Sequence, residues 1–251
     1  MLYTAKATEM ADSNPEEALM LARDALKVAP TLVPAAALAA KLSTRRGDTR
    51  RAAQFVETAY AATPHPDLAD AYLNVRSGDS AAERLARAET LSRLRPGDPE
   101  SAMALAHAAL DARDFARARD TMRPLVDGSG GRRPTVKACR LMAEIEEAEH
   151  GDTGALFEWL QRAQRAPRDP AWIADGVVSD RWGPCSPVTG RLDAFEWATP
   201  KEQISAGDEM EHLQGRPAPV DAPLLVGKVQ PAQEERVAPA EVGAVEDVPA
   251  H

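Results

Sequence analysis

One stretch organises this sequence, because it recurs: Pro15-Glu16-Glu17-Ala18-Leu19-Met20-Leu21-Ala22-Arg23-Asp24-Ala25-Leu26-Lys27-Val28-Ala29-Pro30. Its small residues Ala18, Ala22 and Ala25 and its closing Pro30 return 34 residues later as Ala52, Val56, Ala59 and Pro64. A small side chain at such a position lets two helices lie close together. A terminal proline ends the second helix, since it can neither donate a backbone hydrogen bond nor continue the turn. The recurrence therefore predicts repeated pairs of helices.

A period of 34 residues with two helices per unit is typical of a tetratricopeptide solenoid. We expect an all-α fold with five antiparallel helix pairs in a right-handed array, at residues 2–30, 34–64, 66–96, 99–126 and 135–166. The third pair is irregular, because its turn lies one residue further from its closing proline than in the second. The glycine-rich loop 127–134 interrupts the period and is expected to act as a hinge.

The sequence divides into three predicted regions: a helical solenoid at 1–168, a tryptophan-rich cap at 169–198 and a tail at 199–251. Leu2 already falls where a repeat has its first large apolar residue, so we expect further residues upstream or a neighbouring domain at that end. The tail is rich in Pro, Ala, Val and Glu. Such a segment buries too little apolar surface to offset its chain entropy and is expected to be disordered.

Composition excludes several classes of protein. The chain has 251 residues, a net charge of −9 and only 4% aromatic residues. This charge argues against a general nucleic-acid binder and against adhesion to anionic lipid. No apolar stretch approaches the ~18 residues that a membrane-spanning helix needs, and the start shows no signal peptide.

Candidate catalytic and metal-binding residues are few. Cys139 falls among apolar residues and is expected to be a buried small hydrophobe, and Cys185 in its proline-rich loop to be a spectator thiol rather than a reactive group or a haem contact. None of the five histidines has metal-ligand spacing, and the run of glutamates at 144–149 is expected to be a solvated helix face. Phosphate-binding loops and nucleophile motifs are also missing. We therefore predict no enzyme, no metal and no cofactor.

The cap contains the most specific motif, Asp169-Pro170-Ala171-Trp172 followed by Trp182-Gly183-Pro184-Cys185-Ser186-Pro187-Val188-Thr189-Gly190-Arg191-Leu192-Asp193-Ala194-Phe195-Glu196-Trp197. Together with the repeats, it resembles the HemY family, inner-membrane proteins of Gram-negative bacteria with two membrane helices before a tetratricopeptide region. Some HemY proteins of alphaproteobacteria carry a rubredoxin-like pair of cysteine knuckles here. Ser186 and Thr189 stand where the second knuckle has cysteines, so a metal-free cap is expected, held by Trp172, Trp182, Phe195 and Trp197.

The resemblance implies a bacterial inner-membrane location, with this region facing the cytoplasm and membrane association only through helices that this chain lacks. It also implies a link to haem and porphyrin biosynthesis.

The concave face of the array is the predicted binding surface. Counting from each turn places six residues there: Lys41, Arg45, Tyr72, Arg76, Met103 and His107. We expect partner binding at Lys41, Arg45, Tyr72, Arg76 and His107, because a basic column with an aromatic ring suits an acidic ligand. The alternative is a solvated face whose counter-charges come from neighbouring helices.

Two functions remain open. The first is a non-catalytic scaffold that docks a protein partner or an acidic peptide segment. The second is a tetrapyrrole-handling protein, in which the basic column receives porphyrin carboxylates or haem, as the HemY resemblance implies. We favour the scaffold, because the sequence offers neither an axial ligand nor an apolar slot for a macrocycle. The partner's identity and the oligomeric state do not follow from the sequence.

Overall fold

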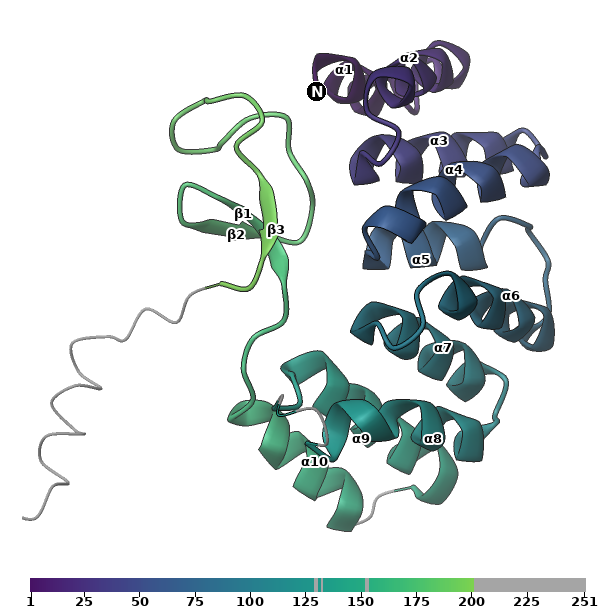
Figure 1. Ribbon diagram of the computed structural model, residues 1–251, viewed down its shortest axis with the longest axis vertical. Helices are drawn as coiled ribbons and strands as arrows, with labels where there is room; N and C mark the ends of the chain where they lie inside the picture. Colours follow the sequence, from purple (N-terminus) through teal and green to yellow (C-terminus); the bar gives the residue numbers. More distant parts are fainter. Residues whose placement is uncertain (129–130, 132, 152–153, 201–251) are drawn as a thin grey trace, which may run out of the picture. The chain divides into compact units, whose positions relative to one another are not determined.

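The computed structural model describes residues 1–128, 131, 133–151 and 154–200. Ten helices follow one another in this part of the chain (Figure 1): α1 (Leu2–Met10), α2 (Pro15–Val28), α3 (Val33–Arg45), α4 (Thr49–Ala62), α5 (Pro66–Leu73), α6 (Ala81–Leu94), α7 (Pro99–Asp111), α8 (Phe115–Val126), α9 (Val136–His150) and α10 (Gly154–Gln164). Three short strands follow them: β1 (Ala171–Ala174), β2 (Val177–Ser179) and β3 (Glu196–Ala198). The predicted all-α solenoid of five helix pairs with a small β-containing cap is confirmed.

Most of the helices begin at a side chain that accepts a hydrogen bond from the first turn. Asn14 caps α2 and Asp48 caps α4, while Ser80 and Glu83 form a reciprocal capping box at the start of α6. The glycine of the turn before α4, Gly47, has a φ of +79°, which a residue with a side chain rarely adopts. These local signals set the boundaries that the repeat predicts.

The helices form two layers that pack in chain order. The first helices of successive pairs, α1, α3, α5, α7 and α9, each contact the next one in the stack, and each of the five also packs against the second helix of its own pair. The small residues of the repeat lie in these contacts: Ala18, Ala22, Ala52, Val56 and Ala59 are all 0% exposed. Alanine lets the backbones approach closely, so the core is dense although it holds few aromatic rings.

The third helix pair departs from the predicted register. Helix α5 has only 8 residues and ends at Leu73, with Asn74 as its C-cap. Arg76 therefore lies in the turn after the helix, outside the first helix of the pair on which it was predicted to lie. Of the two predicted binding residues of this pair, only Tyr72 therefore lies on the helix.

The cap is a three-stranded antiparallel sheet of order β2-β1-β3. In its register, Trp172 on β1 faces Trp197 on β3. After β2, Cys185 and Leu192 form an isolated antiparallel bridge across a tight loop. Of the tail predicted to be disordered, 199–251, residues 201–251 lie outside the described residues, as do residues 129, 130 and 132 of the predicted hinge.

Candidate partner-binding groove

The first helices α5, α7 and α9 form a groove with a cavity volume of about 390 Å³. We call it the first-helix groove. Its walls consist of Pro66, Ala69, Asp70, Leu73, Glu100, Met103, Ala104, His107, Lys137, Arg140, Leu141 and Glu144. Met103 and Leu141 are buried at its base, while His107, Arg140 and Glu144 are exposed. The groove therefore offers an apolar floor with polar groups around it.

Both signs of charge line the first-helix groove. Lys137 and Arg140 bring positive charge, and Asp70 and Glu144 bring negative charge. Burial raises the pKa of Glu100 to about 7, although Lys137 acts against this rise. Near neutral pH this carboxyl group is therefore partly protonated. Of the predicted column, Met103 and His107 line the cavity, whereas Lys41, Arg45 and Arg76 do not.

The cap borders this groove at the beginning of α9. The Lys137 ammonium lies 5.9 Å from the centroid of the Trp197 ring, and the Lys137 backbone N–H donates to Asp169 Oδ2 at 2.8 Å. Asp169 thus places a carboxylate at the N-terminus of α9, where the free N–H groups of a helix attract negative charge. The same lysine lines the groove and contacts the cap.

His65 joins the cap to α5. Its Nδ1 accepts a hydrogen bond from the Asp67 N–H at 3.1 Å, and its ring lies 5.1 Å from the Trp172 ring and 4.0 Å from the Trp197 ring between centroids. The residue is 0% exposed, and this burial lowers its pKa to about 4, with Lys137 acting in the same direction. His65 is therefore neutral at physiological pH.

The predicted cations of the concave face each have a carboxylate partner. Lys41 lies 3.8 Å from Asp70, Arg45 lies 3.2 Å from Asp12, and Arg76 lies 3.7 Å from Asp79. The Asp79 side chain is only 3% exposed, and it also accepts a hydrogen bond from Arg87 at 2.8 Å. Lys41 and Arg45 thus have counter-charges on neighbouring elements, whereas Asp79 lies three residues after Arg76; all three cations stay exposed, and their role in binding stays a prediction.

The prediction for Tyr72 is wrong, because this residue is 5% exposed and its hydroxyl donates to Glu57 of α4 at 2.7 Å. Its ring faces the packing between helices and offers no surface to a ligand. His107 does line the first-helix groove, and its role in binding stays a prediction. Sequence reasoning did not assign the other charged residues of the groove, Asp70, Glu100, Lys137 and Arg140, to binding, and it placed Glu144 on a solvated helix face.

The four aromatic residues assigned to the cap pack inward. Trp172 is 6% exposed, and Trp182, Phe195 and Trp197 are partly buried against the same hydrophobic cluster as α1 to α5. Gly183 lies beneath Phe195: a Cβ there would come within 2.9 Å of the ring. The cap therefore shares its core with the array.

A polar cluster in the cap consists of Asp175, Ser186 and Thr189. Ser186 Oγ accepts hydrogen bonds from the N–H groups of Val188 and Thr189, and Thr189 Oγ1 donates to Asp175 at 2.5 Å. Hydrogen bonds from Ser186 and Thr189 hold the pKa of Asp175 below its ordinary value. This cluster ties the β1–β2 turn to the loop after β2.

The two cysteines differ in exposure. Cys139 is fully buried on α9, as predicted for a small hydrophobe, and burial raises the pKa of its thiol. Cys185 is exposed. Within the described ranges, no group of three His, Cys, Asp or Glu side chains is arranged to hold a metal ion. None of the described helices is both long and apolar enough to cross a membrane.

Comparison with known proteins identifies a curated relative, "Probable magnetosome protein Mms48" of Magnetospirillum gryphiswaldense, strain MSR-1. The two are 27% identical over 195 residues, which cover 76% of this chain and 42% of the relative. The chain thus spans less than half the length of the protein it matches. No family model matches the chain.

Two solved structures are also similar, MamA MSR-1 C2 and MamA AMB-1 P212121. The first has a TM-score of 0.37 at 15% identity and covers 65% of this chain and 93% of its own. The second has a TM-score of 0.34 at 16% identity and covers 65% of this chain and 89% of its own. The fold assignment rests on the helices themselves.

These findings correct the resemblance to HemY, because the curated relative is a probable magnetosome protein. The expected link to haem and porphyrin biosynthesis and the inner-membrane location were implied by HemY alone, and they are wrong for the same reason. The tetrapyrrole alternative also loses its basis, since it rested on the resemblance to HemY.

Proposed function

We propose that this protein is a non-catalytic scaffold that holds a segment of a partner protein in the first-helix groove. One observation carries the proposal: three consecutive first helices leave a cavity of about 390 Å³ with an apolar floor and charged walls. A cavity of this kind suits a side chain and the backbone of a bound segment.

The lining indicates the chemistry of the partner segment. Met103, Ala104 and Leu141 favour one apolar side chain. Arg140 and Glu144 lie four residues apart on α9, so they share a face of that helix. We therefore propose a segment with an apolar residue between charges of opposite sign, in place of the purely acidic segment that the sequence suggested.

The curated relative suggests the setting in which such a scaffold works. Because that relative is described as a probable magnetosome protein, we propose that the partner belongs to the proteins of a magnetosome. The chain matches 42% of the relative's length, so the proposal concerns the helical region that the two share.

A charge exchange across the groove tests the proposal. Arg140→Glu combined with Glu144→Arg keeps the net charge and reverses the pattern on α9. Asp120→Arg combined with Arg123→Asp is the matched control, since this exposed pair on α8 lies outside the groove. Tagged chains are expressed in the source cells, and captured proteins are quantified by mass spectrometry.

We expect one partner to be retained by the wild type and by the α8 control and to be lost from the α9 variant. Equal capture by all three chains, with unchanged melting temperatures, would show that the groove does not hold the partner.

A further inference from the structure

A second groove lies between the second helices of the first two pairs. Helices α4 and α6 pack directly against each other, but in the described part of the chain α2 and α4 do not. The space between α2 and α4 is a pocket of about 310 Å³, which we call the second-helix groove. It shares no residue with the first-helix groove.

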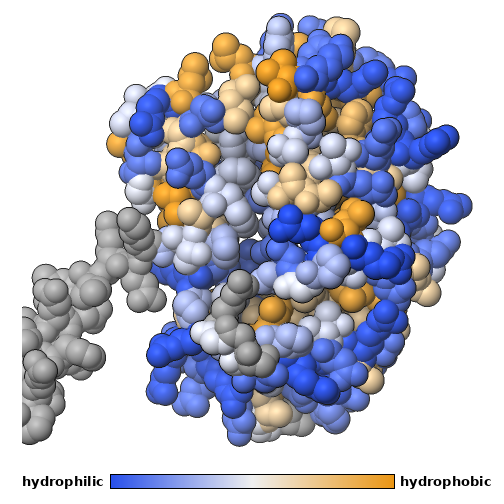
Figure 2. Space-filling model, in the orientation of Figure 1, coloured by the Kyte–Doolittle hydropathy of each residue, from blue (hydrophilic) through white to orange (hydrophobic). Residues whose placement is uncertain are grey.

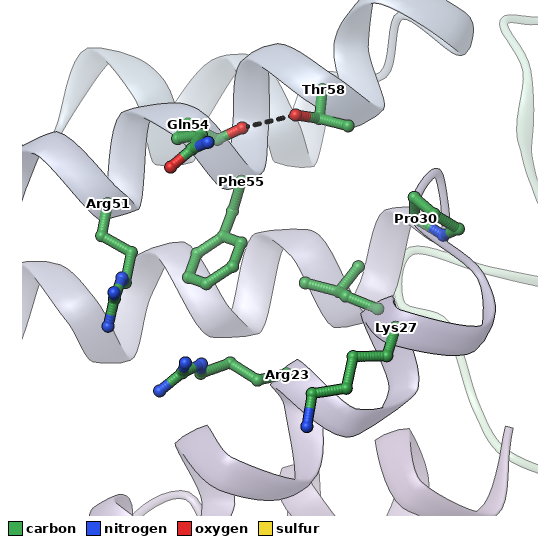
Figure 3. Close-up of a pocket in the computed structure, with 8 residues that line it drawn as sticks. Arg23, Lys27, Pro30, Arg51, Gln54, Phe55 and Thr58 are labelled. Atoms are coloured by element: carbon green, nitrogen blue, oxygen red, sulfur yellow. Dashed lines mark hydrogen bonds between the residues drawn. The ribbon is translucent and has the colours of Figure 1, made fainter.

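The side chains of the second-helix groove carry positive charge only. Arg23 and Lys27 come from α2, and Arg51 comes from α4 on the opposite side (Figure 3). No carboxylate is among the lining residues, although the whole chain has a net charge of −9. This concentration of cations differs from the mixed charges of the first-helix groove.

Two of these cations form exposed ion pairs with carboxylates three residues away, and the third forms none among the described residues. Lys27 pairs with Asp24 at 2.7 Å and Arg51 pairs with Asp48 at 3.9 Å, both within one helical turn and both exposed. Among the described residues, Arg23 has no ion pair. Exposed pairs of this kind exchange partners easily, because they contribute little to stability. Carboxylates entering from outside can therefore compete for these three cations.

The floor of the second-helix groove is apolar. Figure 3 shows the Phe55 ring extending from α4 toward the residues of α2, beside Arg51. Leu26 is 8% exposed, and Pro30 closes one end. The Thr58 hydroxyl donates to the Gln54 carbonyl at 2.9 Å and stays within its own helix. A half-buried ring in a groove lined by cations suits an apolar side chain with acidic neighbours.

We propose that the second-helix groove binds an acidic segment of a partner protein, with an apolar side chain of that segment on Phe55 and its carboxylates on Arg23, Lys27 and Arg51. This site is independent of the first-helix groove and goes beyond the function proposed above. The scaffold would then hold two partner segments at once, one on each helix layer.

Charge and shape favour a protein segment over a membrane surface or a nucleic acid. Phe55 is recessed in the groove, whereas an aromatic residue that inserts into a bilayer must protrude. Three cations neutralise few phosphates, and a chain of charge −9 repels a long polyanion. Figure 2 shows hydrophilic residues over much of the visible surface, with hydrophobic ones in separate small groups.

Fluorescence anisotropy with defined probes tests the proposal on the full chain. The probe is a labelled peptide, Glu-Asp-Glu-Leu-Glu-Asp-Glu, and the comparison peptides replace either every acid by lysine or the leucine by serine. Vesicles of anionic phospholipid serve as the competing surface. Arg23→Glu with Arg51→Glu is the test variant, and Arg50→Glu with Arg93→Glu is the control, since it changes the net charge equally outside the groove.

We expect the acidic peptide to bind the wild type and the control variant and to lose roughly tenfold or more in affinity on the test variant. The lysine peptide should not bind, and the serine peptide should bind more weakly. Binding that weakens equally in both variants would overturn the proposal, because it would reflect net charge alone. Vesicle binding that depends on Arg23 and Arg51, without peptide binding, would overturn it in favour of a membrane surface.

The Arg140→Glu with Glu144→Arg variant separates this result from the function proposed above. It should bind the acidic peptide as the wild type does, whatever its effect on the partner of the first-helix groove. Loss of the acidic peptide from this variant, with Arg23 and Arg51 intact, would place the peptide in the first-helix groove and overturn the second site.

Discussion

The imidazole ring of His65 lies 4.0 Å from the ring of Trp197, centroid to centroid, at an interplanar angle of 54°. His65 is the N-cap of α5 and Trp197 belongs to β3, so this contact joins the array to its cap. Trp172 packs against both rings. The cap is therefore attached at the N-terminal end of the third helix pair, beside the first-helix groove.

Replacing His65 should loosen the cap and leave the helices in place. His65→Asn keeps a side-chain acceptor for the Asp67 N–H but removes the ring from between the two tryptophans. We expect a loss of about 1 to 3 kcal/mol in unfolding free energy and a red shift of tryptophan emission. Far-ultraviolet circular dichroism should be nearly unchanged. Emission identical to that of the wild type would contradict the role given to His65.

The pH dependence of stability should reveal Glu100. Its folded pKa is about 7 against an ordinary value of 4.5, so the folded state retains the proton more strongly than the unfolded chain. Its contribution to stability is complete below about pH 4.5 and is lost as the pH rises through about 7. Relative to Glu100→Gln, the unfolding free energy of the wild type should fall by about 1 to 2 kcal/mol across this pH range.

His65 acts with the opposite sign, because its folded pKa is about 4 against an ordinary 6.5 and its contribution is lost on acidification. Denaturant unfolding of the wild type and of Glu100→Gln at several pH values measures the contribution of Glu100 alone, because both chains retain His65. Parallel stability curves would mean that Glu100 titrates as an ordinary carboxyl group.

Overpacking the repeat should separate the array into units. Ala52 is 0% exposed between paired helices, so Ala52→Leu should force them apart at a cost of about 1 to 3 kcal/mol. Stability in such arrays is roughly a sum over units and their interfaces, so we expect a broadened or split thermal transition. Ala118, also 0% exposed, should behave in the same way. Ala61→Leu on the exposed face of α4 is the control, and identical melting curves for all these chains would disprove the register.

The polar cluster of the cap should depend on Asp175. Asp175→Asn weakens the hydrogen bonds from Ser186 and Thr189, so the loop after β2 should be cleaved faster in limited proteolysis. Because the folded pKa of Asp175 is below 3.8, its contribution is present above that pH and is lost as the pH falls through the folded value. The exposed Asp180→Asn serves as control. Equal cleavage rates in the two variants would rule out the cluster as the element that holds this loop.

The sequence predicts the helix pairs well because their signals are local. Small residues repeat at fixed spacing, and turn residues such as Gly47 and Asp48 directly precede the next helix. The early end of α5 is different: nothing in the period marks Leu73 as its last residue. Because the helix ends before Arg76, Tyr72 and Arg76 do not lie on one helix face.

The charges of the site were predicted less well, because their partners are distant in the sequence. Arg45 meets Asp12 across 33 residues, and no local pattern announces that pair. His65 was judged only as a metal ligand. Its position directly before Pro66 was the signal for a helix cap, since proline favours the first turn.

Site-specific photocrosslinking tests the central claim most directly. A photoreactive amino acid replaces His107 in the first-helix groove, or Asp120 on α8 as the control, and the full chain is irradiated in the source cells. The account predicts a crosslink to one defined segment of a partner protein from position 107, absent from position 120 and lost when Arg140→Glu and Glu144→Arg are added. The same crosslinked proteins from both positions, or a crosslink at 107 that survives the exchange on α9, would contradict it.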